Sequence, residues 1–455
     1  MVAILDPKNL PDGYSFDHIR MLINQRVDSM PIFKRRLIEV PFRLGHPIWI
    51  EDPEFDIDNH LHFSGLPAPG GVDQLAEFAA DVSSRKLDRD KPLWEMWIVE
   101  GLQNGRFALV AKIHHSTIDG VTGTEMIGTL FDLEPTPTTQ NVSTPTPGPR
   151  GRIPSEFELM SQALVARAVR PIEIGKTLWQ TGQRVLDVRQ IRQHTKGPKA
   201  TLPLTAPRTS INTALGTRRR VAFATTSLAE VKLLKNQYGT TVNDVVLAVC
   251  AGALRSYLLA REELPDASLV GVIPIAVSPD SRDLKGSNKV SAMFAQLPTH
   301  EADPIERLQM IHKDTKEAKQ EHSALGPSTL QNWAEHATPN MFAIAARVYA
   351  KMKLADKHRP IANLMISNMY GPDFPIYLDG TDLLAMFPLG PVIDGMGLNI
   401  TIISYRETLC WGLIACARAV PQLSELANLI PKALEELLES ANLKQARSEY
   451  FDIQG

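Results

Sequence analysis

The stretch RFALVAKIHHSTIDG, residues 106–120, starts as an alternating apolar run and stops at two adjacent histidines. Alternation predicts a β-strand, because successive side chains of a strand point to opposite faces. The preceding Asn104-Gly105 pair is a typical hairpin turn, and residues 96–102 before it are predicted to form the partner strand. We therefore predict a hairpin whose return strand, residues 106–115, ends at the histidine pair.

The two histidines have different predicted roles. In a regular strand His114 and His115 point to opposite faces, so they do not share one pocket. His115 falls on the apolar face with Phe107 and Leu109, where partial desolvation favours the neutral, basic ring. A neutral histidine accepts a proton from a hydroxyl nucleophile, and such general-base help is worth roughly 10²–10⁴-fold. We predict that His115 is the catalytic base and that His114 supports it.

Asp119 and Gly120 follow the histidines at a fixed offset. Asp119 either holds the loop by a salt bridge or hydrogen bonds, or is the N-cap of the next helix, and both readings stay open. Gly120 is expected to let the chain turn closely beneath the site. A metal site is a rival, because His and Asp are ligand types, but the opposed strand faces and the lack of a nearby His/Cys cluster count against it. A purely structural pair of histidines is the remaining alternative.

The composition excludes several classes of protein. The 455 residues exceed what one hydrophobic core usually serves, so two domains are expected. A net charge of -3 gives no reason to expect a nucleic-acid partner. Three cysteines (Cys250, Cys410 and Cys416) lack metal-type spacing, and their odd number argues against a disulfide scaffold. No signal peptide and no apolar run of roughly 20 residues is evident. We predict a cytoplasmic protein whose membrane contacts are peripheral.

The chain divides at a Pro/Thr-rich stretch, residues 134–155, which is typical of an extended connector. Helices are expected over 156–194. We predict an N-terminal domain over 1–133, a linker with bridging helices over 134–215, and a C-terminal domain over 216–455. Both outer segments mix strands and amphipathic helices, which predicts two α/β domains facing each other across a cleft. Further strands are predicted at 1–6, 218–223, 270–277, 361–369, 398–405 and 408–416, and further helices after Ser15, after Gly71, from Thr241 and over 422–438.

The helix that begins at Thr241 opens with Thr-Val-Asn-Asp. Thr241 and Asp244 fit a capping box, in which each side chain accepts a backbone hydrogen bond from the other residue. A direct role of Asp244 in the site is the open alternative. The sequence contains no G-x-S-x-G elbow, no P-loop and no dinucleotide fingerprint. The missing nucleophile motif favours direct transfer in a ternary complex over a covalent intermediate.

These residues resemble the bacterial wax ester synthase/diacylglycerol acyltransferase family. His114 to Gly120 match its HHxxxDG motif, which condensation domains of nonribosomal peptide synthesis share, so this motif alone indicates only the superfamily of CoA-dependent acyltransferases. Pro92-Leu93-Trp94 is similar to the family's PLW segment, and Asn243-Asp244 to its ND motif. Further similarities lie at 252–255, 273–275 and 397–401. Taken together, the resemblance covers nearly the whole chain.

The resemblance implies two chloramphenicol-acetyltransferase-like domains around an active-site channel. It implies His115 as the base, a long-chain acyl-CoA as donor, and diacylglycerol or a fatty alcohol as acceptor. Acyl-CoA would be a substrate, and no cofactor or metal is expected. The inner membrane face or lipid droplets are the expected peripheral surfaces. The alternatives are a related acyltransferase or condensation enzyme with a carrier-bound donor, and a catalytically weak lipid-surface binding protein.

The chain departs from the family pattern in four places. It begins within the first strand, and Pro421-Gln422 stands where Pro-Asp is usual. Residues 368–372, Asn-Met-Tyr-Gly-Pro, stand where Asn-Val-Pro-Gly-Pro is favoured, and Ser278 stands where arginine is frequent, which leaves Asp119 without an obvious ion-pair partner. Beyond the predicted catalytic residues His115, His114 and Asp119, the predicted site-shaping residues are Gly120, Pro92, Leu93, Trp94, Asn243, Asp244, Asn368, Gly371 and Pro372.

Overall fold

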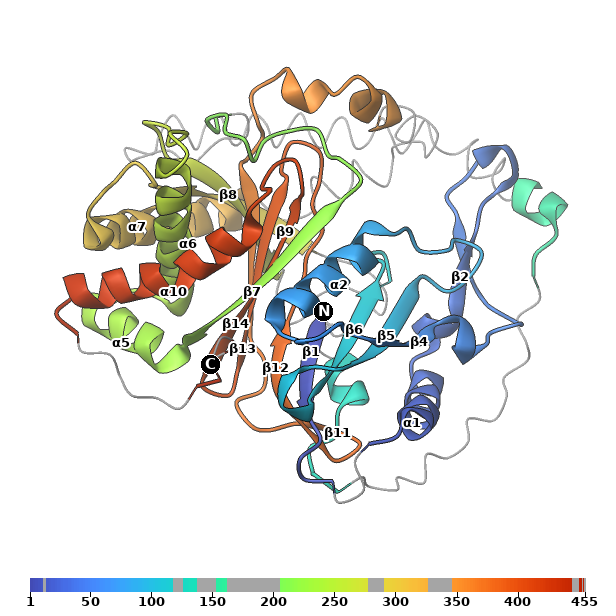
Figure 1. The fold of residues 1–455 in the computed structure, drawn as a ribbon. Helices are drawn as coiled ribbons and strands as arrows, with labels where there is room; N and C mark the ends of the chain where they lie inside the picture. The colour runs from blue at the N-terminus through green and yellow to red at the C-terminus, as the bar shows by residue number, and fades with distance from the viewer. Residues whose placement is uncertain are drawn as a thin grey trace.

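The computed structural model of the chain describes residues 1–10, 14–117, 126–136, 153–161, 205–276, 290–325, 346–443, 450–451 and 453. Within these ranges the fold is mixed α/β and is built around two six-stranded sheets. Mainly N-terminal strands form the first sheet and C-terminal strands form the second, and the two lie next to each other (Figure 1). The predicted α/β class is confirmed.

The first sheet combines strands from distant parts of the chain. Its central strand β1 pairs antiparallel with β6 on one side and with β12 on the other, while β4 pairs parallel with β5. The segment that ends at Phe387 therefore completes a sheet whose other main strands precede residue 114. The predicted boundaries at 133 and 215 stay predictions. Across the sheet the strands are β11 (Tyr377–Leu378), β12 (Thr381–Phe387), β1 (Val2–Asp6), β6 (Phe107–Ile113), β5 (Trp94–Glu100) and β4 (Leu61–Gly65).

The second sheet is mixed. Its centre pairs β10 in parallel with β13 and β8, and antiparallel pairs flank this centre on both sides. The predicted strands of this half are confirmed, with β13 and β14 at the predicted bounds and β7 extending further than predicted, to Ser227. In order the strands are β7 (Arg219–Ser227), β14 (Thr408–Cys416), β13 (Leu398–Tyr405), β10 (Leu364–Met369), β8 (Leu269–Ala276) and β9 (Val290–Leu297).

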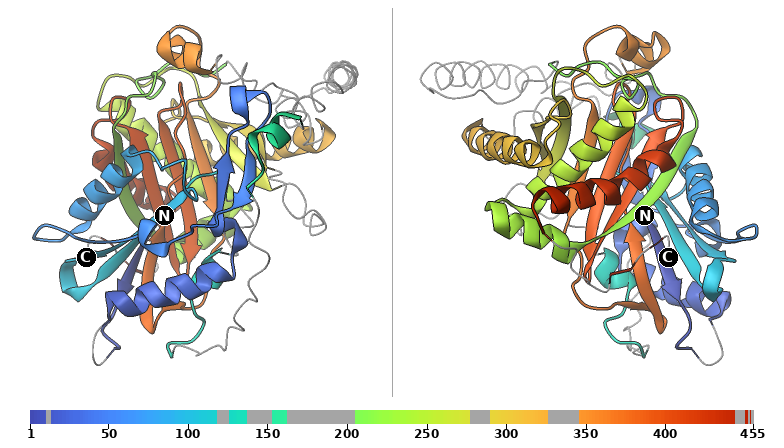
Figure 2. Two further views of the ribbon diagram at one scale, coloured as in Figure 1. Left: turned by 90° about the vertical axis from the view of Figure 1, so that its right-hand side faces the viewer. Right: turned by 60° about the vertical axis from the view of Figure 1, so that its left-hand side comes forward.

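Helices cover the outer face of the second sheet (Figures 1 and 2). They bury a continuous apolar core to which α6 contributes most of its length. By length and composition α6 would suffice to cross a membrane, but 72% of the relevant window is buried inside the fold, as expected of a core helix. The helices are α5 (Leu228–Tyr238), α6 (Val242–Leu259), α7 (Pro304–Leu325) and α10 (Leu423–Ser440).

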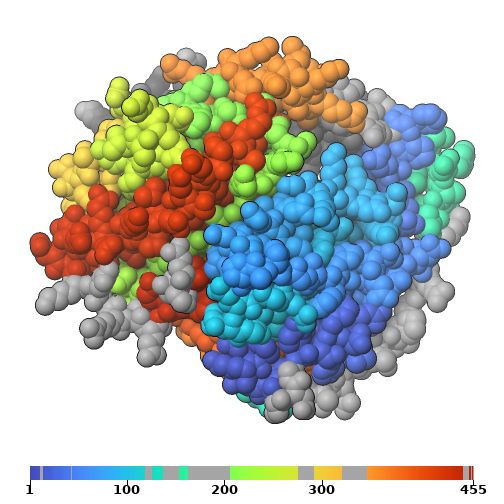
Figure 3. Space-filling model, in the orientation of Figure 1, coloured from blue at the N-terminus to red at the C-terminus, as the bar shows by residue number. Residues whose placement is uncertain are grey.

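The inner face of the second sheet packs against the first half. The rings of Phe223 on β7 and Phe387 on β12 are in tilted contact, with centroids 4.7 Å apart, within a core that draws residues from both sheets. The second sheet is therefore buried on both faces, which matches its nearly continuous apolar strands. In the space-filling view the blue N-terminal half and the green-to-red C-terminal half abut along a long boundary (Figure 3).

Several further predictions are confirmed in the first half. A helix follows Ser15, α1 (Phe16–Asp28), and another follows Gly71, α2 (Val72–Ser84). Asn104 and Gly105 both have positive φ, as the predicted hairpin turn requires. The two-stranded β2 (Arg35–Ile38) and β3 (Ile48–Glu51), and also β4, β9, β11, β12, α5 and α7, were not predicted. Of the expected helices over 156–194, residues 156–161 are helical and 162–194 lie outside the described residues, as does most of the connector.

Candidate active site

Strand β6 ends at Ile113, before the two histidines. The last residue of β6, Ile113, pairs with Trp94 of β5. Pro92, two residues before Trp94, has no N–H to donate, so it cannot extend the strand pairing. The backbone N–H of His114 donates instead to the carbonyl of Leu93, at 2.9 Å, and a turn follows. The prediction that the strand continues to His115 is therefore wrong. The histidines lie in the loop at the strand's carboxyl end.

His114 is held by its own loop. Its Nδ1 lies 2.7 Å from the hydroxyl oxygen of Ser116 and accepts the Ser116 backbone N–H at 3.2 Å. An N–H that points at Nδ1 requires that nitrogen to be an acceptor, so the ring is neutral and has its proton on Nε2. Partial desolvation lowers the pKa of His114, and the nearby Arg89 and His115 lower it further. These contacts fit the supporting role predicted for this residue.

His115 is exposed to solvent. The prediction of a partly desolvated ring on an apolar strand face is wrong, because alternation ceases where the strand does. In the described part of the chain no hydrogen bond to the His115 ring is present. Among the described residues the His115 ring is thus unbonded, whereas the His114 ring is hydrogen-bonded within its own loop. This difference, and not the faces of a strand, is what separates the two histidines.

The segment before β5 fixes the position of this loop. Trp94 is fully buried and its indole N–H donates to the Phe33 carbonyl at 2.7 Å. The ring stacks on His60, with centroids 4.5 Å apart, and the His60 Nδ1 lies 2.8 Å from the Trp94 carbonyl oxygen. Leu93, also buried, provides the carbonyl that binds His114. Pro92, Leu93 and Trp94 thus adjoin the histidine loop, and their predicted site-shaping role stays a prediction.

The loop beyond the histidines is only partly described. Thr117 donates its backbone N–H to the His114 carbonyl at 2.9 Å, and its side chain is buried. Among the described residues the Thr117 hydroxyl has no hydrogen-bond partner, which is uncommon for a buried polar group. Asp119 and Gly120 lie outside the described residues, so their predicted roles stay predictions.

Asp244 lies at the first turn of α6 and is almost completely buried. The predicted capping box is confirmed: Asp244 accepts the Thr241 N–H at 2.9 Å, and Thr241 accepts the Asp244 N–H at 3.2 Å. Two further partners come from α7, where His312 Nδ1 lies 2.8 Å and the Thr315 hydroxyl 2.7 Å from the carboxylate. Burial alone would raise the pKa of Asp244, but these hydrogen bonds outweigh burial and lower it. Asn243, its neighbour, is half-buried.

His312 and Thr315 were not predicted. They lie on the face of α7 that packs against α6, where Leu308, Ile311 and Ala318 are buried. The sequence did contain one signal of this contact: Thr315 stands where the helical period of α7 places an apolar residue. Such a residue needs a polar partner when it is buried, and Asp244 is that partner.

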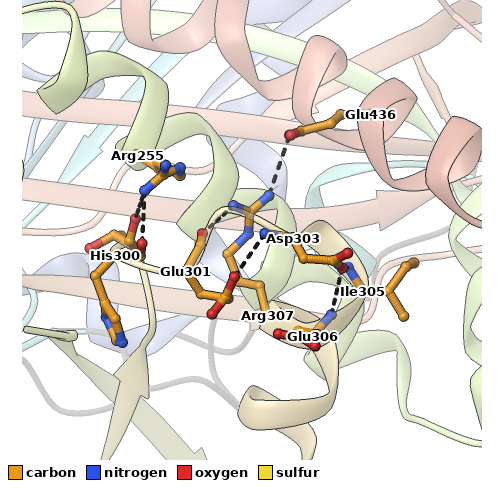
Figure 4. Close-up of polar contacts among 9 residues, drawn as sticks. Arg255, His300, Glu301, Asp303, Ile305, Glu306, Arg307 and Glu436 are labelled. Carbon is orange, nitrogen blue, oxygen red and sulfur yellow. Dashed lines mark hydrogen bonds and ion pairs between the residues drawn. The ribbon is translucent and has the colours of Figure 1, made fainter.

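Two arginines set the position of α7 (Figure 4). Arg307 is fully buried, and its guanidinium donates to the Glu301 carbonyl at 3.0 Å and to Glu436 on α10 at 3.3 Å. Arg255 on α6 donates to the carbonyls of Thr299 and His300, in the loop that leads into α7. A Cβ at position 252 would lie 3.1 Å from the Ala433 Cβ and 3.2 Å from the Arg307 guanidinium, so the glycine leaves room for both side chains. These contacts bring His312 within reach of Asp244.

The turn after β10 contains the last group of predicted residues. Asn368 is half-buried near the end of β10, where it pairs with Ile402. A Cβ at Gly371 would lie 2.2 Å from the Ser404 carbonyl oxygen, so only glycine fits this close backbone approach. The Pro372 carbonyl accepts the Arg406 N–H at 2.9 Å. The turn is therefore docked against the end of β13, despite its departure from the family pattern.

The structure brings some predicted residues together and leaves others apart. Pro92, Leu93 and Trp94 directly adjoin the histidine loop. The Asp244 cluster belongs to the helix layer of the second sheet, and residues 368–372 lie at the end of β10. Among the hydrogen bonds of the described residues, none connects these three places. His114 and His115 are both exposed, but only the His114 ring is hydrogen-bonded among the described residues.

Two family models match the chain. Residues 1–246 match the wax ester synthase/diacylglycerol acyltransferase catalytic domain, and residues 286–438 match the C-terminal domain of the same family. A Mycobacterium tuberculosis (strain CDC 1551 / Oshkosh) protein named as a diacylglycerol O-acyltransferase is 35% identical over 454 residues, which cover 99% of this chain and 88% of the relative. A second relative of that name in the same strain is 32% identical over 443 residues, 95% of this chain and 93% of the relative.

Solved structures agree with these matches. The wax ester synthase/diacylglycerol acyltransferase from Marinobacter aquaeolei VT8 superposes with a TM-score of 0.66 at 29% identity, covering 97% of this chain and 94% of that one. The trichothecene 15-O-acetyltransferase from Fusarium sporotrichioides superposes with a TM-score of 0.56 at 12% identity, covering 96% and 90%. At that identity the second likeness is one of fold alone.

Proposed function

Because the chain belongs to the wax ester synthase/diacylglycerol acyltransferase family, and is therefore an acyltransferase, we propose that it moves a long-chain acyl group from acyl-CoA to diacylglycerol. The product is triacylglycerol. Fatty alcohols are proposed as a second class of acceptor, with wax esters as products. The observation that supports this most is the contrast between the exposed His115 and the locally bonded His114 at the end of β6.

The proposed reaction is a direct transfer with His115 as general base. The acceptor hydroxyl donates its proton to the imidazole while its oxygen forms a bond to the thioester carbonyl carbon. The tetrahedral intermediate then collapses, the carbon–sulfur bond breaks, and the leaving thiolate takes the proton from His115. The products are the ester and free CoA, and the ring returns to its starting state. Asp119 and Gly120 are proposed to hold this loop in place.

His114 is proposed to support the reaction without taking the proton. Its Nδ1 accepts the Ser116 N–H, so this nitrogen is already occupied. Its backbone N–H is tied to Leu93, next to the buried Trp94. The ring and its backbone thus hold the loop from which His115 projects. We propose that loss of the His114 ring disturbs this position, with a smaller effect than loss of the base itself.

The acceptors are water-insoluble, so we expect the enzyme to act at a lipid surface, either the inner membrane face or a lipid droplet. Contact with that surface is proposed to be peripheral. The described helix with enough length and hydropathy to span a membrane, α6, supports this because it is mostly buried in the core.

The decisive test is free-CoA release by the purified protein with long-chain acyl-CoA and a panel of acceptors: diacylglycerol, monoacylglycerol, and long and short alcohols. We expect diacylglycerol to support turnover. His115→Ala should lower kcat by roughly 10²–10⁴-fold, and His114→Ala should lower it less. Because the His115 ring is exposed, the thermal unfolding midpoint of His115→Ala should match the wild type. Normal turnover by His115→Ala would exclude the proposed mechanism, and a lack of turnover with every acceptor would exclude the function.

A further inference from the structure

The segment 346–361 lies at the end of the second sheet where the chain leads into β10, and it projects beyond the strands there (Figures 1 and 2). It is helical over 346–351 and continues as the short helix η6 (Leu354–Asp356). In the space-filling view its orange atoms form the outer surface at the top of the molecule (Figure 3). Neither the predicted site nor the proposed transfer mechanism uses this segment, which is called the cationic segment below.

The charge of the cationic segment differs from that of the chain as a whole. Five of its side chains are positive and one is negative, whereas the whole protein has a net charge of -3. All five positive side chains are exposed, and among the described residues none of them forms an ion pair. Unpaired cations concentrated on one exposed segment predict a partner with many negative charges. The five are Arg347, Lys351, Lys353, Lys357 and Arg359.

Two carboxylates at this end of the sheet are already hydrogen-bonded to the backbone. Asp356 accepts the Ala214 N–H at 2.7 Å, and Asp394 accepts the Leu215 N–H at 2.8 Å. Burial raises the pKa of Tyr349 and the charge of Asp394 raises it further, which places Asp394 beside the cationic segment. Even with both acids counted, the positive side chains outnumber the negative ones at this surface.

Large apolar side chains are exposed among these cations. Val348 is 45% exposed and Met352 is 52% exposed, and the Met352 N–H donates to the Val348 carbonyl at 2.9 Å. One helical turn therefore separates the two side chains, which places them on one face. Ile361, at the end of the segment, is also about half exposed. Apolar side chains mixed with lysine and arginine are typical of a helix that lies on an anionic lipid surface. A nucleic-acid backbone, by contrast, would engage the cations alone.

The cationic segment is fixed to the rest of the fold. The Arg208 guanidinium donates to the Ala355 carbonyl at 3.0 Å and also to the His358 carbonyl. The Tyr349 hydroxyl lies 2.6 Å from Nε2 of His358, and Ala355 and Pro360 are buried. The exposed cations are therefore presented on a backbone that is ordered before a partner arrives, and less ordering entropy is lost on binding.

We propose that the cationic segment docks the protein on an anionic phospholipid surface. Its lysines and arginines bind the phosphate groups of the lipid heads, and Val348 and Met352 insert between the outer ends of the acyl chains. The proposal rests on the proposed function, because the water-insoluble acceptors are dissolved in such a surface. It adds to that function the part of the molecule that meets the lipid and the charge that the lipid must have.

The test is co-sedimentation of the full-length protein with vesicles of phosphatidylcholine that contain phosphatidylglycerol. The triple variant Lys351→Gln/Lys353→Gln/Lys357→Gln should have a partition coefficient about a hundredfold lower than the wild type, because each lysine near an anionic surface contributes roughly fivefold to binding. The wild type should bind vesicles of pure phosphatidylcholine only weakly, and high salt should weaken its binding to the anionic vesicles. An unchanged partition coefficient in the triple variant overturns the proposal.

The matched control is the triple variant Lys232→Gln/Lys313→Gln/Lys432→Gln. It removes one exposed lysine from each of α5, α7 and α10, so the change in net charge is the same and the cationic segment is intact. We expect wild-type partitioning. If this variant loses as much binding as the first one, net charge alone decides the binding and the proposed docking surface is wrong.

A second pair of variants tests the apolar side chains. Val348→Ser/Met352→Ser should lower the partition coefficient about tenfold, because less apolar surface leaves water on binding. This loss should persist at high salt, since salt screens charges and not apolar contacts. Leu233→Ser/Met310→Ser, which replaces partly exposed apolar residues of α5 and α7, is the control and should bind like the wild type. Unchanged binding by Val348→Ser/Met352→Ser overturns the proposed insertion.

Sedimentation needs no turnover, so failure of the docking surface and failure of the proposed function are distinguishable. Lysine-dependent sedimentation without turnover on any acceptor supports the docking surface while the function fails. Turnover of diacylglycerol in anionic vesicles that does not depend on the three lysines refutes the docking surface alone. If the wild type binds heparin through these lysines but does not sediment with anionic vesicles, the partner is another polyanion and the proposal is overturned.

Discussion

The histidine loop and the Asp244 cluster are both short polar segments at the end of a regular element, yet they are built in opposite ways. His115 is exposed and, among the described residues, has no hydrogen-bond partner. Asp244 is 1% exposed and accepts hydrogen bonds from three residues on two helices. The comparison teaches that two motifs that are equally visible in a sequence can differ completely in the burial and hydrogen bonding of their key side chains. One is proposed to offer a reactive group to a substrate, and the other joins two helices by buried hydrogen bonds.

The largest expected effect on stability comes from removal of the Asp244 carboxylate. Asp244→Ala removes the acceptor of the Thr241 N–H, leaves the buried Thr315 hydroxyl with only the more distant His312 carbonyl as acceptor, and removes the capping box. We expect the free energy of unfolding to fall by about 3 kcal/mol, measured by urea denaturation. Asn243→Ala, one residue earlier on the same helix turn, should change it far less. An equal fall in the free energy of unfolding in both variants would show that the hydrogen bonds of Asp244 do not stabilise the fold more than an ordinary residue of this turn.

The free energy of unfolding at acid pH tests the same contribution of the Asp244 carboxylate. The pKa of Asp244 is lower in the folded chain than the ordinary value of 3.8, because the hydrogen bonds outweigh the effect of burial. Its contribution to stability is therefore fully present above the unfolded pKa and is lost as the pH falls through the lower folded pKa. The difference in unfolding free energy between wild type and Asp244→Asn should stay constant down to about pH 4 and shrink below it. A difference that shrinks near neutral pH would contradict this assignment.

A smaller effect is expected at Gly371, where the backbone and not a side chain sets the constraint. Gly371→Ala places a Cβ within 2.2 Å of the Ser404 carbonyl oxygen, so the turn must move away from β13. We expect the free energy of unfolding to fall by roughly 1–3 kcal/mol. Gly65→Ala is the matched control, because a Cβ there meets no atom within 4 Å. Thermal unfolding of the two variants should separate them clearly.

The smallest effect is expected in the histidine loop itself. Thr117→Val replaces a buried hydroxyl that has no partner among the described residues with a methyl group of similar size. Stability should stay the same or rise by up to about 1 kcal/mol. A fall in the free energy of unfolding would show instead that the Thr117 hydroxyl is hydrogen-bonded in the native loop. If kcat falls while stability holds, the hydroxyl meets the substrate.

Prediction from sequence succeeded where one local signal decides the outcome. Strands β13 and β14 were predicted at their observed bounds because two long apolar runs are separated by the short turn Arg406-Glu407. The capping box at Thr241 was predicted because its donors and acceptors lie three residues apart. Strand β12 was missed, although Asp379-Gly380 before it is a hairpin signal and both residues have positive φ. That signal was present and overlooked.

Prediction failed where distant residues decide the outcome. His115 was placed on a buried strand face because alternation was extended past Ile113, and the end of the strand depends on where its partner β5 begins. The contact between Asp244 and His312 joins residues 68 positions apart, so no local pattern reveals it. The family resemblance indicated the PLW and ND segments as site-shaping, which stays a prediction. It did not show the packing and hydrogen bonds that both segments make.

Strand β12 has a consequence for how the chain is made. The central strand β1 is synthesised long before its neighbour β12, which ends only at Phe387. Until that point of synthesis β1 presents an unpaired edge, which is a template for association with other chains. The N-terminal sheet therefore cannot be completed during most of translation. A fragment truncated before residue 381 should aggregate, whereas the full chain closes its own edge.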